Sequence, residues 1–135
     1  MTASKDSSEN CIICIQTAAV AQDLLNAVTS IHKLHLKVTG IGSFAAHKGL
    51  DYDAFGNHAD DLVEGFQGAE EKILDLPNTA PSELNTIEEG LEFLRKMKDK
   101  IDGLQSVMPY SEIVNDLDTV KSTINSIKYK LLFLK

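Results

Sequence analysis

The last quarter of the chain has the most regular hydrophobic pattern. Its apolar residues recur at alternating spacings of four and three, namely Ile113, Leu117, Val120, Ile124, Ile127, Leu131 and Leu134. This alternation places them on one stripe of an α-helix. Ser111 can cap the first turn of that helix. The pattern therefore predicts a helix over residues 111–134.

Three earlier segments show weaker versions of the same helical pattern. They cover residues 9–38, residues 44 or 47 to 74, and residues 84–104. Their apolar stripes are, in chain order, Val20, Leu24, Val28, Ile31, His35 and Val38; Phe55, Leu62, Phe66 and Ile73; and Leu84, Ile87, Leu91, Leu94 and Ile101. Gly40 and Gly42 can end the first helix, and Ser82 or Asn85 can cap the third.

These four segments predict one all-α domain, an antiparallel four-helix bundle over residues 10–135. No segment alternates in the manner of a strand. Residues 1–9 are polar, and we expect a disordered tail there. Residues 75–83 contain two prolines and form the clearest linker.

Charge and composition narrow the classes of function. The net charge is −7, which counts against binding to nucleic-acid phosphates or anionic membranes. The start of the chain lacks the features of a signal peptide, so we expect a cytoplasmic protein. Phosphate-binding loops and hydrolase motifs are absent from the sequence. We interpret Cys11 and Cys14 as small apolar residues of the first helix with free thiols.

All four histidines lie in one short stretch at the junction of the first two predicted helices: His32, His35, His47 and His58. The carboxylates Asp51, Asp53, Asp60, Asp61 and Glu64 occupy the same part of the chain. Clustered imidazoles and carboxylates on adjoining helices are typical of a metal site in a bundle. Mixed nitrogen and oxygen ligands suit iron, manganese or zinc.

The stretch from Leu34 to Glu64 resembles the signature of the Dps-like ferritins. Leu34, His35, Val38 and Gly40 match its Leu-His-x-x-Val-x-Gly opening. His47 and Asp51 match the His and Asp that follow at the family's spacing. The later matches are His58, Asp60 and Glu64, which fit a His-x-Asp-x-x-x-Glu run if two residues are deleted before it.

The resemblance implies a ferritin-like bundle that binds iron, or another divalent metal, between two subunits and oxidises Fe(II). It assigns His35, His47 and Asp51 to one chain and Asp60 and Glu64 to its partner, with His58 as a further metal ligand. No catalytic residue is expected beyond the metal ligands. It also implies a homo-oligomer, at least a dimer, in a family whose members form hollow dodecamers. The ferritin-like connection needs a linker that runs the length of the bundle, and nine or ten extended residues reach about 30 Å.

The sequence leaves several alternatives open. The two-residue deletion rotates one ligand set against the other by about 200° on a continuous helix. His47, Asp51, His58 and Asp61 would then share a face, unless a kink near Gly56 restores the family register. A plain up-down-up-down bundle is the alternative topology. The alternative functions are a ferritin-like bundle without metal that acts as a structural or interaction module, and a helical adaptor unrelated to ferritins.

Overall fold

The computed structural model describes residues 11–38 and 50–133. Within these ranges the chain forms four helices and no strand: α2 (Ile12–Lys37), α4 (Asp53–Glu70), α5 (Ile87–Gln105) and α6 (Ser111–Phe133). This confirms the predicted all-α four-helix bundle. The predicted tail over residues 1–9 lies outside the described part of the chain.

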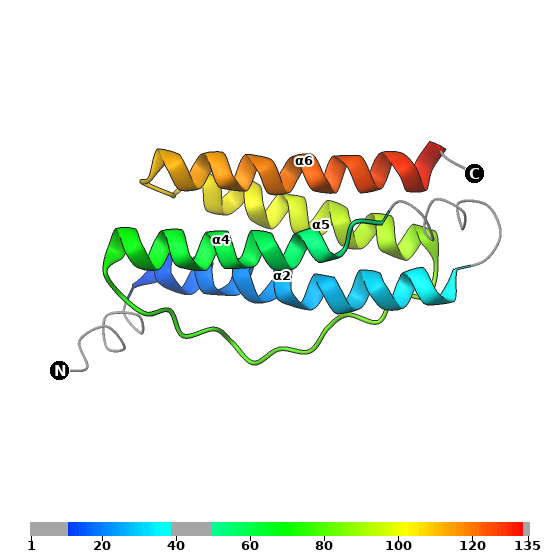
Figure 1. Cartoon of the computed structure of the whole chain (residues 1–135), viewed down its shortest axis with the longest axis horizontal. Coiled ribbons are helices and arrows are strands. Elements are labelled where there is room, and N and C mark those ends of the chain that lie inside the picture. The colour runs from blue at the N-terminus through cyan, green and yellow to red at the C-terminus, as the bar shows by residue number, and fades with distance from the viewer. Residues whose placement is uncertain (1–10, 39–49, 134–135) are drawn as a thin grey trace.

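The helices form a ring in which each packs against two neighbours (Figure 1). Helix α2 contacts α4 and α5, and α6 contacts the same two helices from the opposite corner. The connection from α4 to α5 runs the length of the bundle alongside α2. Helices α4 and α5 therefore point the same way, and α2 and α6 point the opposite way. One long crossover is the connectivity of ferritin-like bundles, so the up-down-up-down alternative is wrong.

The crossover, residues 71–86, is longer than the predicted linker because both flanking helices are shorter. Helix α4 ends at Glu70, and Glu71 adopts a left-handed backbone with φ 57°. Helix α5 begins at Ile87 and is capped by Thr86, whose hydroxyl accepts from the Glu89 N–H at 3.1 Å. Ser82 and Asn85 are therefore not the cap. An extended chain advances more than twice as far per residue as a helix, so this crossover easily spans the length of α4.

Polar contacts hold the crossover against α2. The Asn26 side chain donates to the hydroxyl of Thr79 at 2.9 Å. Near the other end of α2, the Lys37 ammonium donates to Asn85 Oδ1, also at 2.9 Å. These two contacts fix the crossover at points about three helical turns apart along α2.

The predicted apolar stripes form most of the core. The α6 stripe is buried from Ile113 to Leu131, and Leu134 lies outside the described residues. Ile73 is the clear exception, since 65% of its surface is exposed, while the neighbouring Leu74 is buried. The helix ends before Ile73, so the helical spacing no longer applies to it. On α2 the predicted stripe included His35, which is only half-buried. The adjacent Leu34 is fully buried.

The start of the second helix also differs from the prediction. Helix α4 begins at Asp53, with Tyr52 as its N-cap, and residues 50–52 are not helical. Helix α2 ends at Lys37 because Val38 is extended, so the helix stops before Gly40. Gly40 and Gly42 lie outside the described residues, as does the predicted helical segment 44–49.

The two cysteines form a disulfide, so the predicted free thiols are wrong. Cys11 is the N-cap of α2 and Cys14 lies in its first turn, which places their Cα atoms 5.1 Å apart. That separation lies within the range that a disulfide bridges.

Helix α2 is long and apolar enough to cross a membrane by length and composition. Packed core helices of soluble proteins meet the same criterion. In this bundle Leu24, Ile31 and Leu34 of α2 are fully buried against the other helices.

Candidate functional site

His58 contacts side chains of both α4 and α6. It projects from α4 toward α6, where its Nε2 atom lies 2.9 Å from the hydroxyl of Thr123. The ring of Phe55, one turn earlier, meets the imidazole edge-on at 6.4 Å between ring centres. His58 is half-buried, and these contacts fix the orientation of its ring.

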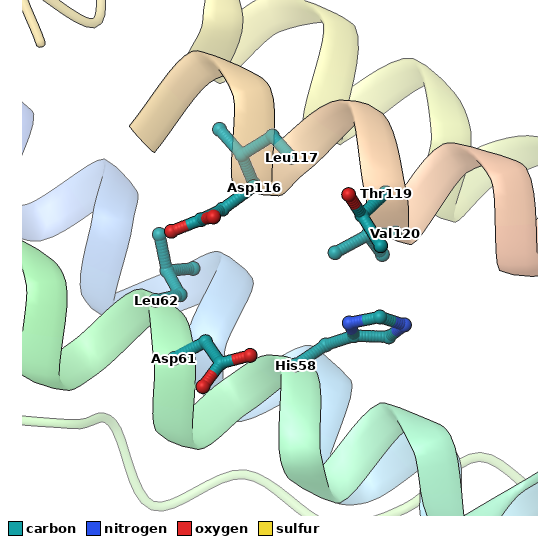
Figure 2. A pocket seen from close by; sticks show the side chains of 7 residues that line it. All are labelled: His58, Asp61, Leu62, Asp116, Leu117, Thr119 and Val120. Atoms are coloured by element: carbon teal, nitrogen blue, oxygen red, sulfur yellow. The ribbon is translucent and has the colours of Figure 1, made fainter. Parts of the chain in front are cut away.

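A cavity of about 210 Å³ opens beside His58 between α4 and α6. Figure 2 shows His58 and Asp61 projecting from α4, with Asp116 and Thr119 facing them from α6. The members of each pair lie three positions apart, so their side chains share one helical face. The apolar wall consists of Leu62, Leu117 and Val120.

Burial and charge act on His58 in opposite directions. Partial burial disfavours the imidazolium and lowers the pKa of His58 below its ordinary value. The nearby carboxylates of Asp61, Asp51 and Asp116 favour the imidazolium and offset part of this effect. Burial has the larger influence, so the neutral ring predominates at pH 7. A neutral imidazole can bind a metal ion or exchange a proton.

A second aromatic group lies where α2 meets the start of α4. The His32 ring stacks on Tyr52 at 4.4 Å between centres, and the His35 ring is tilted at 6.0 Å from the same tyrosine. His32 is exposed and His35 is half-buried. Tyr52 therefore orients both histidines at the outer junction of the two helices.

The structure separates the predicted metal ligands into different surroundings. Asp60 and Glu64 are exposed on α4, one turn apart, and neither lines the His58 cavity. Asp51 is exposed immediately before α4, and His47 lies outside the described residues. Among residues 11–38 and 50–133, no group of three or more His, Cys, Asp or Glu side chains could hold a metal ion.

The structure shows whether a kink near Gly56 changes the helical register of α4. The helix runs without interruption through Gly56, so no kink there restores the family register. His58 and Asp61 line the same cavity, whereas Asp60 and Glu64 lie elsewhere on α4. Asp61 is exposed and also lines the cavity. Asp53 is exposed at the start of α4.

Sequence reasoning missed the α6 side of the cavity. Asp116, Thr119 and Thr123 recur at spacings of three and four, so they lie on one face of α6 beside its apolar stripe. That spacing is visible in the sequence. Which of the α4 residues they face depends on the relative position of two helices that are distant in sequence.

Comparisons of the chain with protein-family models, with curated proteins and with solved structures found no match.

Proposed function

We propose that this protein binds and oxidises Fe(II) at sites formed between two copies of the chain, as Dps-like ferritins do. The single long crossover supports the proposal most strongly, because it gives the bundle ferritin-like connectivity. Within that connectivity, His35 and Asp51 lie at the junction of α2 and α4, and Asp60 and Glu64 follow along the outside of α4.

The exposure of the predicted ligands is consistent with a site that needs a second chain. Asp51, Asp60 and Glu64 all have exposed side chains, so a partner could reach them. The described residues of one chain provide no three-ligand group by themselves. We therefore propose that His35, His47 and Asp51 of one chain bind Fe(II) together with Asp60 and Glu64 of the partner subunit. Neutral imidazoles and carboxylates form a ligand set that suits iron.

His58 is not part of the proposed inter-subunit site. Its imidazole bonds to Thr123 of its own chain and faces α6. The ring is therefore directed away from Asp60 and Glu64, which lie outside its cavity. The sequence resemblance named His58 as a ligand, and in the proposal its role is to join α4 to α6.

Two exposed leucines on one side of α2 support association through the α2–α4 face. Leu25, His32 and Leu36 recur at spacings of seven and four, which places them on one side of α2. His32 contacts Tyr52, so this side borders the start of α4. Leu36 is 67% exposed and Leu25 is 38% exposed. We propose that a second copy packs on this side of α2 and buries both leucines.

Anaerobic titration of Fe(II) into the full-length protein, followed by calorimetry, tests whether the site binds iron. We expect the wild-type protein to bind Fe(II) and the double variant Asp60→Asn, Glu64→Gln to lose that binding. The double variant Glu92→Gln, Asp99→Asn serves as the matched control, because it neutralises two exposed carboxylates on α5 that are not proposed ligands. Equal binding by the double variant and the wild type would contradict the proposed ligand set.

A second candidate function is a bundle without metal that acts as a structural or interaction module. The unbroken course of α4 through Gly56 favours it, because no kink there compensates for the two-residue deletion from the Dps-like spacing. It predicts a stable dimer that contains no iron after purification and does not bind added Fe(II). Recovery of iron in a fixed ratio to the chain would count against this candidate. A cytoplasmic location stays a prediction under either function.

A further inference from the structure

The cysteine pair lies at one end of the bundle, far along α2 from the histidines. Cys11 is the N-cap residue of α2, and Cys14 lies in the first turn. The two sulfurs form a disulfide, yet their surroundings differ. Cys14 is fully buried in the core, whereas Cys11 is partly exposed at the helix start. Of the two cysteines, only Cys11 therefore has exposed surface that another molecule can contact.

The start of α2 provides a polar environment that favours a thiolate at Cys11. The backbone N–H of Cys14 donates to the Cys11 sulfur at 3.1 Å. Unpaired N–H groups give a helix N-terminus a partial positive charge, which stabilises a nearby anion. The first turn of α2 contains no acidic side chain that would oppose this effect. Cys-x-x-Cys pairs at helix N-termini commonly contain a reactive cysteine for this reason.

We propose that Cys11 and Cys14 form a redox-active pair that exchanges with a dithiol of a polypeptide, with Cys11 as the sulfur that is attacked. This proposal is independent of the iron site. A substrate thiolate attacks Cys11 Sγ, the Cys11–Cys14 bond breaks, and Cys14 leaves as a thiolate that takes up a proton. The second substrate thiolate then attacks the substrate sulfur of the mixed disulfide, and Cys11 leaves and is protonated. The substrate is oxidised to a disulfide and the pair is reduced to two thiols.

Exposed apolar residues around Cys11 point to a polypeptide substrate. Ile12 is 73% exposed and Ile15 is 53% exposed, and both lie within one turn of the disulfide. Ile73 follows the end of α4 and Val107 follows the end of α5, so both belong to the same end of the bundle. They are 65% and 50% exposed. Exposed apolar side chains at this end of the bundle would favour contact with a polypeptide over contact with a small hydrophilic thiol.

Alkylation of single-cysteine variants tests the roles of the two sulfurs. The chain has only two cysteines, so Cys14→Ser leaves Cys11 alone and Cys11→Ser leaves Cys14 alone. With iodoacetamide at pH 7, we expect Cys11 to react about tenfold faster than free cysteine. Cys14 should react slower than free cysteine, because it is buried. A Cys11 rate no higher than that of free cysteine, or a faster reaction at Cys14, would overturn the proposal.

Reduction of the oxidised wild-type protein tests the exchange without any substitution. The probes are two short peptides with two cysteines each, one with flanking leucines and one with flanking serines, at equal thiol concentration, with the reduced fraction read by mass after quenching. We expect both to reduce the folded protein, and the leucine peptide to be the faster. Equal rates would overturn the assignment of a polypeptide substrate. Resistance of the folded protein to both would identify a structural disulfide, which withstands the glutathione pool, and would overturn the exchange itself.

Discussion

The imidazole of His58 on α4 and the hydroxyl of Thr123 on α6 are joined across the bundle at 2.9 Å. The two residues are separated by 65 positions in the chain, so their contact reports the relative position of two long helices. It also lies beside a cavity that contains the carboxylates of Asp61 and Asp116. The charge of His58 therefore bears on both the stability of the bundle and the chemistry of that cavity.

The pH dependence of stability should include a contribution from His58. Burial lowers its pKa in the folded protein, so the unfolded chain binds a proton first as the pH falls. The free energy of unfolding should therefore decrease between about pH 7.5 and 5.5, and the decrease should be smaller in His58→Gln. Urea denaturation at several pH values across this range measures the free energy of unfolding of each protein. Thr123→Ser keeps the hydroxyl and should retain the wild-type decrease, whereas an unchanged decrease in His58→Gln would contradict the assignment.

Gly90 is required by the close approach of α5 to α2. A Cβ atom at this position would lie 2.5 Å from Cδ2 of Leu34, which is fully buried. Overpacking a core costs about 1–3 kcal/mol, against a helix gain of about 0.5–1 kcal/mol for Gly→Ala. We expect Gly90→Ala to lower the free energy of unfolding in urea by about 1 kcal/mol.

Gly103 provides the matched control for Gly90, since it lies in the same helix. A Cβ atom there would meet no described atom within 4 Å. Gly103→Ala should therefore stabilise the protein by about 0.5–1 kcal/mol. If both variants were stabilised equally, Leu34 would have room to move, and the close packing of α2 and α5 would not be limiting.

Association through the α2–α4 face should depend on Leu36. Replacing this exposed leucine by aspartate would place a charge in the proposed contact between two copies, where it would be buried without a partner. Sedimentation velocity should show the wild-type protein as a dimer or larger and Leu36→Asp as a monomer. Leu132→Asp, at a 44% exposed position on α6, should remain associated. A monomeric wild-type protein would exclude an inter-subunit site.

The sequence was sufficient to predict the elements of the fold where the hydrophobic spacing is long and regular. The stripe of α6 was correct at every described position, because one periodicity continues along the whole helix. The end of the second helix was not predictable, because Glu71 adopts a left-handed backbone where a glycine is the usual signal. Ile73 was placed in the core for that reason.

The site was less predictable than the fold, because it depends on contacts between helices. Neither the pairing of His58 with Thr123 nor the cavity beside it follows from the pattern of a single helix. His35 was placed on the apolar stripe, while its neighbour Leu34 is the fully buried residue. Adjacent residues of a helix point about 100° apart, so Leu34 faces the core while His35 lies at the edge of the buried face. The disulfide was missed because it depends on the backbone of the N-cap at Cys11.

Aerobic oxidation of Fe(II) by mixed subunits tests the central proposal most directly. Near-ultraviolet absorbance would follow the wild-type protein, His35→Ala, and the double variant Asp60→Asn, Glu64→Gln, against a protein-free blank. We expect the wild type to exceed the blank and each variant alone to match it. An equal mixture of the variants after subunit exchange should recover about a quarter of the wild-type sites, since half of the dimers would contain one intact site. The iron site would be contradicted if His35→Ala oxidised Fe(II) as fast as the wild type, or if the wild type were no faster than the blank. If both variants were inactive and their mixture recovered no activity, the position of the site between two chains would be contradicted.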